Sequence, residues 1–383
     1  MRTTAITLIA ALWGMGALAQ TSPATTGAST GKRIVVVQTL PMSGPLANVG
    51  EDIATATRAY FAQFNKSRAP SQQVELRVVD DGNDQAKAQL GIAQIVASAA
   101  AGSAPVAIVS CFGTVSCLGA MAASKAARVP LIGPIAGAPV FRAPEQSTVY
   151  AVRPSAVTEV AKLLEYVKFL QLSKLAVYVQ DDGFGKGYLG PTLEQIKAVG
   201  LAPPQVITLN PQAPDYAQAA SAVEQAKPDA IIMLANVKHS AEFVSAIAKA
   251  GASPWLMNLA GQANAGFVKS AAGSRAFNVF AAMTPSPWRP SISVVREYQA
   301  AWQAATGNTA FSYLTLEAYI NAKVLGEAIT RTRGDVNAAS IQAALTSGVI
   351  ELGGIDARFV GGKRVGTGFV DLAVLDGKGV FKQ

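Results

Sequence analysis

Histidine and cysteine are scarce in this chain of 383 residues, which contains one histidine and two cysteines. The single histidine, His239, cannot form the clusters typical of zinc sites, and it lacks the setting of a catalytic triad. The sequence also lacks a G-x-S-x-G elbow, a Walker loop and a Rossmann G-x-G-x-x-G motif. We therefore expect no enzymatic activity, no metal and no cofactor, and we expect His239, at a helix start, to be a surface residue.

Long apolar runs are missing from the chain after its N-terminal segment. No later run approaches the roughly 20 residues that a transmembrane helix needs. The N-terminus itself carries Arg2, an apolar stretch at 6–18 and the triplet Ala17-Leu18-Ala19. This pattern is typical of a secretory signal peptide, which we place at 1–19, followed by a disordered leader at 20–32. Because the residue directly after the cleavage position is not a cysteine, we expect a periplasmic protein without a lipid anchor.

Basic clusters are absent as well, although the formal net charge is +8. Lysines and arginines are scattered singly, and no basic run interleaves with aromatic residues, so we expect no nucleic acid partner. The export signal places Cys111 and Cys117 in an oxidising compartment, where they either form a local disulfide or remain two buried thiols. Their spacing is not C-x-x-C, which argues against redox catalysis.

The mature length predicts about two domains, each built from alternating strands and helices. Short β-branched runs alternate with amphipathic, Ala-rich segments, as in a parallel sheet covered by helices on both faces. In the first series we predict strands at 33–38, 73–79, 106–109 and 131–132, and helices at 52–65, 85–99 and 118–126. In the second we predict helices at 156–170, 187–198, 216–226 and 240–250, and strands at 175–179, 205–209, 230–234, 255–258 and 279–282.

A crossing segment at Thr284-Pro285-Ser286-Pro287 precedes two long helices, predicted at 291–306 and 311–332. The segment that contains these helices has too few strands to form a lobe alone, so we assign it to the first lobe. A final hairpin is predicted at 368–375, with a turn at 376–377 before Val380. The expected fold is α/β, with two doubly wound parallel-sheet lobes joined by several hinge strands. The lobes comprise 33–153 with 285–365, and 154–284 with 366–383.

Small, Gly-rich and hydroxyl-bearing loops follow the predicted strands of the first lobe. They lie at 40–45, 80–83, 110–114 and 133–139. In open α/β sheets, ligands bind beyond the carboxyl ends of the strands. Backbone amides and hydroxyls at helix starts suit a carboxylate or another anion. For any one loop, the alternative is that Gly and Pro merely mark a turn.

Four ordered motifs resemble the leucine/isoleucine/valine-binding protein family over 33–383. They are Pro41-Met42-Ser43-Gly44-Pro45, Asp80-Asp81, Val129-Pro130-Leu131-Ile132 and Asp181-Asp182-Gly183-Phe184-Gly185-Lys186-Gly187. The resemblance implies a type I periplasmic binding protein that delivers amino acids or related small acids to an ABC permease in the inner membrane. A receptor that reports to a sensor or regulator is the alternative. We expect a monomer.

The resemblance also implies the residues that bind the ligand. A carboxylate is expected on the first lobe near Phe112, Gly113 and Thr114, with Ile135, Ala136 and Gly137 alongside and Ser43 lining the cleft. On the second lobe, Phe184 resembles the aromatic residue that closes over the ligand. The later contact positions of the family fall on Asn236, Ala260 and Gly261. The family's cysteine partner in the turn at 80–83 is absent, which leaves Cys117 for Cys111.

At two positions the sequence departs from the amino-acid-binding members. Ala260 stands where they place a carboxylate for the ligand's ammonium, and Asn236 replaces a usual Tyr. A buried ammonium without a countercharge costs several kcal/mol, unless Asp181, Asp182 or another acid reaches the site. The expected ligand is thus a branched-chain or aromatic amino acid, or a carboxylic acid or amide without an amino group.

Four other residues in or near the cleft have two interpretations each. Asp181 and Asp182 either cap the following helix or contact the ligand. Lys186 either faces solvent or neutralises a second acid group. Trp288 either packs at the hinge or contacts a ring in the cleft.

Overall fold

The computed structural model describes Met1 and residues 33–100, 103–263, 265–271, 274–362 and 365–382. The signal peptide and leader predicted at 1–32 lie outside these residues, apart from Met1. Among the described helices, none combines the length and apolar character that a membrane crossing requires. The described residues from 33 onward belong to one unit of the chain.

The first lobe is built on a parallel sheet. In its described part, the strand order is β2-β1-β3-β4-β5. These strands are β1 (Ile34–Leu40), β2 (Val74–Asp80), β3 (Ala107–Val109), β4 (Leu131–Ile132) and β5 (Val149–Tyr150). Helices α1 (Ala47–Asn65), α2 (Gln85–Ala97) and α3 (Thr114–Ala127) follow the first three strands. All seven β1 residues are buried, as expected for a parallel strand covered on both faces.

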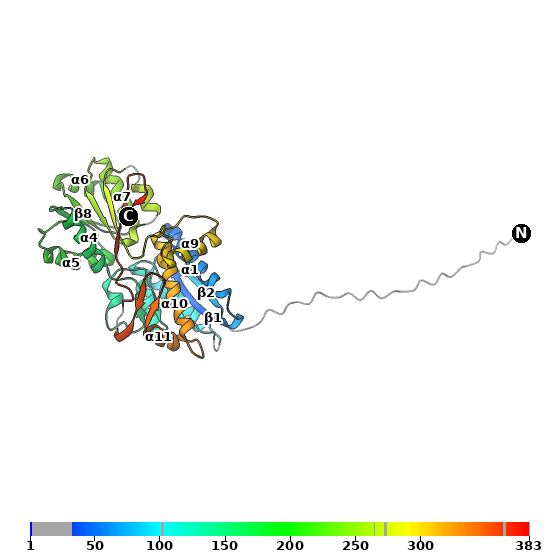
Figure 1. The fold of residues 1–383 in the computed structure, drawn as a ribbon. Helices are drawn as coiled ribbons and strands as arrows, with labels where there is room; N and C mark the ends of the chain where they lie inside the picture. Colours follow the sequence, from blue (N-terminus) through cyan, green and yellow to red (C-terminus); the bar gives the residue numbers. More distant parts are fainter. Residues whose placement is uncertain (2–32, 101–102, 264, 272–273, 363–364, 383) are drawn as a thin grey trace. The chain divides into compact units, whose positions relative to one another are not determined.

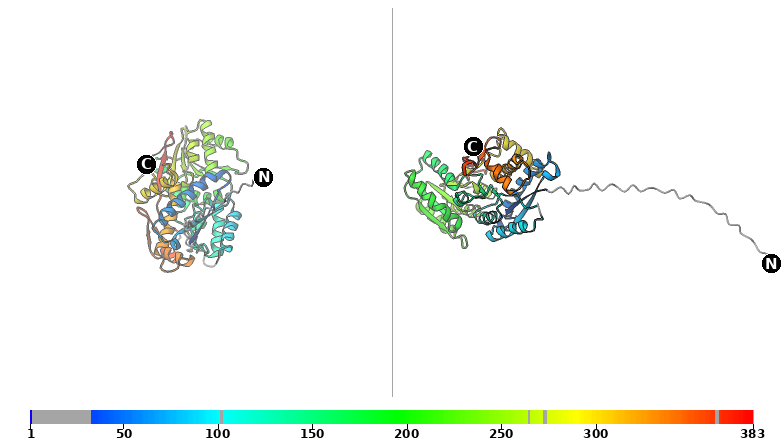
Figure 2. Two further views of the ribbon diagram at one scale, coloured as in Figure 1. Left: turned by 90° about the vertical axis from the view of Figure 1, so that its right-hand side faces the viewer. Right: turned by 90° about the horizontal axis from the view of Figure 1, so that it is seen from below.

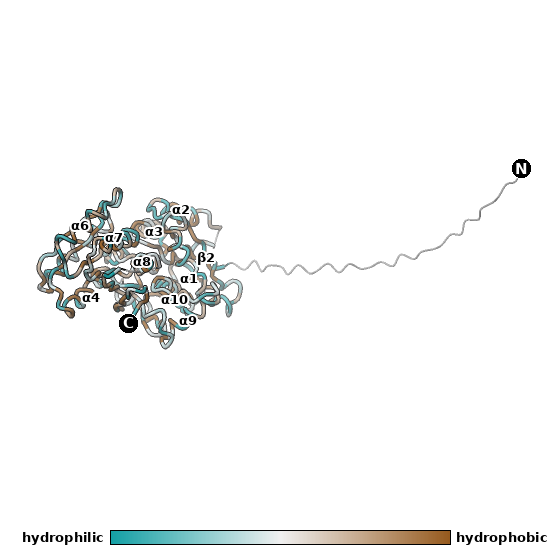
Figure 3. The backbone as a smooth tube through the Cα atoms, turned by 90° about the horizontal axis from the view of Figure 1, so that it is seen from above, coloured by the Kyte–Doolittle hydropathy of each residue, from teal (hydrophilic) through white to brown (hydrophobic). Residues whose placement is uncertain are grey.

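The second lobe has a larger, mostly parallel sheet of order β14-β13-β10-β9-β8-β6-β7. Its strands are β6 (Leu175–Gln180), β7 (Gln205–Leu209), β8 (Ala230–Leu234), β9 (Trp255–Asn258), β10 (Phe277–Ala282), β13 (Asp371–Leu375) and β14 (Phe381–Lys382). Its helices are α4 (Ala156–Phe169), α5 (Gly183–Ala198), α6 (Tyr216–Ala226), α7 (Val237–Lys249) and α8 (Ala265–Ala271). Only the hairpin of β13 and β14 adds antiparallel pairs to the described sheet. Hydrophobic and hydrophilic residues alternate along α6 and α7 (Figure 3), as expected for helices with one face on a sheet.

Three late helices pack on the first lobe, far from it in sequence. They are α9 (Ser293–Thr306), α10 (Tyr313–Arg331) and α11 (Ala338–Thr346), followed by a hairpin of β11 (Val349–Glu351) and β12 (Asp356–Arg358). Helix α10 lies beside α1 (Figure 1), where the rings of Tyr60 and Tyr319 meet edge to face with centroids 5.2 Å apart. Short 3-10 turns occur at Gly44–Leu46, Pro70–Gln72, Pro139–Arg142, Ala260–Gln262 and Val360–Gly362.

The chain passes between the two lobes after β5, after β10 and after β12. Figures 1 and 2 show the green segments of the second lobe grouped apart from the blue, cyan and orange segments of the first. The predicted α/β class, with two parallel-sheet lobes, is confirmed. The lobe boundaries expected after residues 153, 284 and 365 stay a prediction.

Most element ends differ from the predicted ones by one or two residues, but four helices start earlier than predicted. Helices α1, α3, α5 and α7 begin at Ala47, Thr114, Gly183 and Val237. Elements β5, α8, α11, β11 and β12 were not predicted from the sequence. They are two to nine residues long, too short to show a clear period.

A disulfide joins Cys111, just after β3, to Cys117 in α3. Both side chains are fully buried. The bond therefore ties the first turns of α3 to the end of the strand that precedes it.

We predict that replacing Cys111 and Cys117 together by alanine lowers the free energy of unfolding by about 2 kcal/mol, because the closed loop restricts the unfolded chain. Urea unfolding with and without a thiol reductant measures this. Reductant should destabilise the natural protein and leave the double variant unchanged. An equal response of both proteins would contradict the prediction.

Candidate functional site

A pocket lies where the carboxyl ends of strands from both lobes meet. It contains about 820 Å³ of empty space, part of which is open solvent. The strand order reverses between β1 and β3 in one sheet and between β6 and β8 in the other. Such reversal points are where open α/β sheets hold their ligands.

The start of α3 forms the first-lobe wall. Gly113 has a φ of 76°, in the left-handed region that favours glycine, and its N–H donates to Ile135 O at 3.1 Å. Thr114, the first residue of the helix, is only 8% exposed, and its Oγ1 makes no hydrogen bond within the described part of the chain. The N–H groups of the first helical turn have no intrahelical acceptor. This wall therefore offers hydrogen-bond donors at the positive end of a helix dipole.

The starts of α5 and α7 form much of the second-lobe wall. Asp182 Oδ1 accepts from Phe184 N at 2.9 Å and Gly185 N at 3.1 Å, and this cap starts α5. Asn236 Oδ1 accepts from His239 N at 3.0 Å and starts α7 in the same way. Gln180 connects the two caps, because its Nε2 donates to Asp182 Oδ2 at 2.6 Å and its Oε1 accepts from Asn236 N at 2.7 Å.

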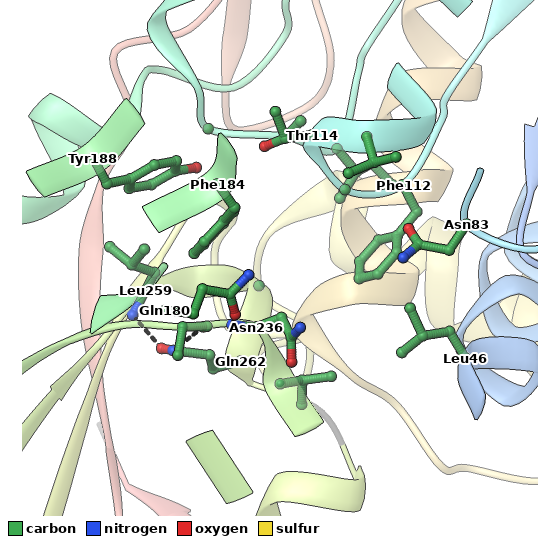
Figure 4. Close-up of a pocket in the computed structure, with 18 of the residues that line it drawn as sticks. Leu46, Asn83, Phe112, Thr114, Gln180, Phe184, Tyr188, Asn236, Leu259 and Gln262 are labelled. Carbon is green, nitrogen blue, oxygen red and sulfur yellow. Dashed lines mark hydrogen bonds between the residues drawn. The ribbon is translucent and has the colours of Figure 1, made fainter. Parts of the chain in front are cut away.

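Gln262 fixes the loop after β9 to the same wall. Its Oε1 accepts from Leu259 N at 2.6 Å, and its Nε2 donates to Ala235 O and to Ser240 Oγ, both at 2.7 Å. The side chain is 2% exposed. Figure 4 shows Gln262, Gln180 and Leu259 across the pocket from Phe112 and Leu46.

A buried ionic cluster contributes Arg153 and Glu159 to the pocket lining. Arg153, in the segment that leaves β5, donates to Glu159 Oε1 at 2.7 Å and lies 3.5 Å from Glu317 Oε2. Glu159, in the first turn of α4, also accepts from Ala260 N at 2.8 Å. Arg142 donates to the carbonyl oxygens of Ala136, Ala138 and Arg153.

The cluster shifts the pKa of its members in directions that follow from burial and charge. Burial raises the pKa of Glu317, and Arg153 only partly opposes this. Burial and the neighbouring charge of Arg153 lower the pKa of Arg142 to about 10. The pKa of Arg153 is raised, because the attraction of Glu159 and Glu317 outweighs its burial.

Aromatic rings supply much of the apolar surface. Phe112 comes from the first lobe, and Phe184 comes from the second, where it stacks on Tyr188 with centroids 4.5 Å apart. Gly137 lets Tyr188 approach, because a Cβ at that position would lie 2.4 Å from Tyr188 Oη. The remaining apolar lining comes from Leu46, Val115, Val237 and Leu259, among others.

The structure brings nine of the eleven predicted ligand-binding residues to this pocket. They are Phe112, Gly113, Thr114, Ile135, Ala136, Gly137, Phe184, Asn236 and Gly261. Ser43 is not among the lining residues; it is exposed, and its N–H donates to Asp80 Oδ1 at 3.2 Å. Ala260 is not among them either, and its N–H donates to Glu159 Oε2.

The prediction for His239 was wrong. Its side chain is 6% exposed, and its Nδ1 lies 2.7 Å from Tyr216 Oη. The helix begins at Val237 and not at 240, which turns the histidine inward beneath the Asn236 cap. Burial lowers the pKa of His239.

The other residues with open interpretations are now placed. Asp182 caps α5 and also lines the pocket, whereas exposed Lys186 pairs with Asp181 at 2.9 Å. Trp288 stacks on Phe381 with centroids 5.6 Å apart, near the crossing that follows β10.

Several lining residues were not identified from the sequence. They are Leu46, Asn83, Arg153, Glu159, Gln180, Tyr188 and Gln262, with some apolar neighbours. Two of them carried a usable signal, because Asn83 lies in the strand-end loop at 80–83 and Gln180 directly follows a predicted strand. The described residues hold no group of three or more His, Cys, Asp or Glu suited to a metal ion.

Comparisons with known proteins agree with this architecture. A family model described as "Periplasmic binding protein" matches residues 34–373. An extracellular ligand-binding receptor from Verminephrobacter eiseniae is similar in structure, with a TM-score of 0.81 and 22% identity, covering 92% of this chain and 100% of that one. No curated protein matches the sequence.

Two further solved structures are similar over 91% of this chain, each at 15% identity. One is a fatty acid ABC transporter substrate-binding protein from Thermomonospora curvata, with a TM-score of 0.79 and 91% of its own chain covered. The other is a leucine-binding protein from Thermotoga maritima, with a TM-score of 0.76 and 97% covered. At such identities the likeness shows the fold alone.

We predict that Glu317→Gln flattens the dependence of stability on pH. Because the folded state holds the Glu317 proton more tightly than the unfolded chain, this group stabilises the fold below the unfolded pKa of about 4.3. That stability is lost as the pH rises toward the raised folded value. Urea unfolding at pH 5 and pH 8 should therefore show that the free energy of unfolding falls less between these pH values for the variant than for the natural protein.

The exposed Glu194→Gln is the matched control for this measurement, and it should follow the natural protein. A variant whose stability falls between pH 5 and pH 8 as much as that of the natural protein would show that Glu317 is ionised throughout this range.

Proposed function

This chain belongs to the periplasmic binding protein family, and we propose that it captures a small carboxylate-bearing ligand in the pocket between its lobes. The family places the protein in the periplasm. The finer assignment to the leucine/isoleucine/valine-binding proteins is also proposed, on the four ordered motifs of the sequence.

One observation carries the carboxylate assignment. Thr114 Oγ1 is buried, faces the pocket at the first turn of a 14-residue helix, and has no hydrogen-bond partner among the described residues. A buried hydroxyl without a partner costs about 1–3 kcal/mol. A ligand carboxylate satisfies this hydroxyl and the free amides of the helix start together.

Capture should proceed by closure of the lobes. The pocket takes residues from both lobes, and the chain crosses between them at segments that permit hinge motion. A ligand shifts such an equilibrium only through its differential affinity for the closed state. Contacts from α3 on one side and from α5 and α7 on the other supply that difference.

We further propose that the protein acts as a monomer and passes its ligand to an ABC permease. Two similar solved structures, a fatty acid ABC transporter substrate-binding protein and a leucine-binding protein, support a substrate-binding role with an acid as ligand, since leucine and fatty acids both carry a carboxylate. The alternative partner is a sensor or regulator. Permease and ATPase genes beside the gene for this chain would favour import, and a sensor gene would favour the alternative.

We expect carboxylic acids to raise the melting temperature of the purified protein, because a ligand that binds the folded state stabilises it by mass action. The screen compares amino acids, aromatic acids and short-chain acids with their methyl esters and primary amides. Esters or amides that stabilise the protein as well as the acids do would contradict the carboxylate assignment.

We predict that Thr114→Val weakens the binding of the tightest-binding acid from that screen by about 1–2 kcal/mol, because the hydroxyl that holds the carboxylate is lost. Isothermal titration calorimetry measures the change. Thr309→Val, at an exposed loop position, is the matched control and should bind as the natural protein does. Equal affinity of the Thr114 variant would remove Thr114 from the site.

A further inference from the structure

An ammonium group places specific demands on a binding pocket. It presents donors only and carries a positive charge, so it needs several acceptor atoms and a countercharge that is not already neutralised. The acceptors that line this pocket therefore test whether the ligand carries an amino group.

The two carboxylates of the lining are both engaged. Glu159 accepts from Arg153 through one oxygen and from Ala260 N through the other. Asp182 accepts two backbone N–H groups and the amide of Gln180, at the positive end of α5. Each charge is already compensated, the first by a guanidinium and the second by three donors and the helix dipole.

The three side-chain amides of the second-lobe wall also have engaged oxygens. Gln180 Oε1 accepts from Asn236 N, Asn236 Oδ1 accepts from His239 N, and Gln262 Oε1 accepts from Leu259 N. These are the bonds that fix the caps and the loop after β9. An ammonium would have to compete with them for the same oxygens.

Backbone carbonyls of the lining are engaged in the same manner. Gly137 O accepts from Ala156 N, and Ala235 O accepts from Gln262 Nε2. The carbonyls of Ile135, Ala136 and Leu259 accept from Gly113 N, Arg142 Nη1 and Gln262 N. These bonds leave an ammonium few acceptors: the side-chain oxygen of Asn83 has no hydrogen-bond partner among the described residues, but an uncharged amide oxygen supplies no countercharge.

The groups that remain available are mainly donors. Thr114 Oγ1 and the first-turn amides of α3 lie on one lobe, and Asn236 Nδ2 lies on the other, with no hydrogen-bond partner among the described residues. Phe112 and Phe184 project into the space between (Figure 4). A donor-rich, apolar pocket suits an acceptor group on an apolar body.

We propose that the ligand is a carboxylic acid without an amino group, with an uncharged apolar body such as a phenyl ring or a branched chain. This rests on the carboxylate site proposed above and specifies the rest of the ligand. Asn236 is the specificity-determining residue of the second lobe, because it presents an amide donor toward the pocket.

Calorimetry on matched pairs of acids tests this proposal. The pairs are 4-methylpentanoate with leucine, and 3-phenylpropionate with phenylalanine, which differ only by the amino group. In the pair that binds more strongly, the acid without the amino group should bind at least about tenfold tighter. Equal or tighter binding of the amino acid overturns the proposal and leaves the carboxylate site standing. If no acid of either kind binds, while an ester or amide does, the carboxylate site fails as well.

Asn236→Asp provides the complementary variant. Aspartate keeps the α7 cap through one oxygen and replaces the amide donor by a charged acceptor at the same place. The preference for the acid over its amino counterpart should fall at least about tenfold. Asn210→Asp adds the same charge at an exposed turn outside the pocket and should leave the preference unchanged.

The two comparisons exclude different alternatives. A preference unchanged in Asn236→Asp would overturn the role of Asn236. Asp182→Asn tests the rival countercharge, since asparagine also caps helices well. If this substitution weakens the binding of leucine more than the binding of 4-methylpentanoate, Asp182 binds an ammonium and the proposal fails.

Discussion

The site depends on the buried ion pairs that the guanidinium of Arg153 makes with Glu159 and Glu317. Arg153 lies where the chain leaves the first lobe and bonds to Glu159 in the first turn of α4, while Glu317 approaches from α10 of the first lobe. A buried charge stripped of water is tolerated only when it is paired. These three residues therefore have to stay together, and two of them, Arg153 and Glu159, line the pocket.

The same cluster explains how the loop after β9 is held without an acidic side chain of its own. Glu159 accepts from the backbone N–H of Ala260, so a carboxylate lies beside this loop although the loop residue is alanine. Its charge is matched by Arg153, however, and cannot serve a ligand cation at full strength. The sequence shows the missing acid at 260, but only the structure shows which acid lies there and what neutralises it.

Alternating strands and helices were enough to predict two parallel-sheet lobes, because strand and helix periods are local properties. The first turns of α3 and α5 were missed because Gly113, Gly183 and Gly185 look like loop punctuation. The first turn of α7 was missed because the Asn236 cap that starts it was not recognised, and His239 was misplaced with it. The Arg153 cluster was beyond reach, since Glu317 is distant in sequence and only tertiary folding brings it near.

The pocket's selectivity and the starts of its helices are one feature. Asp182, Asn236 and Gln180 hold the second-lobe wall by accepting the N–H groups that begin α5 and α7 or link them. Each side-chain oxygen that accepts a hydrogen bond in a cap is no longer available as an acceptor for the ligand. On the opposite lobe, glycine at 113 provides no capping side chain, so the α3 amides stay open. In the proposed function, donors left free on one wall favour an acid, and acceptors already used on the other wall disfavour an amine.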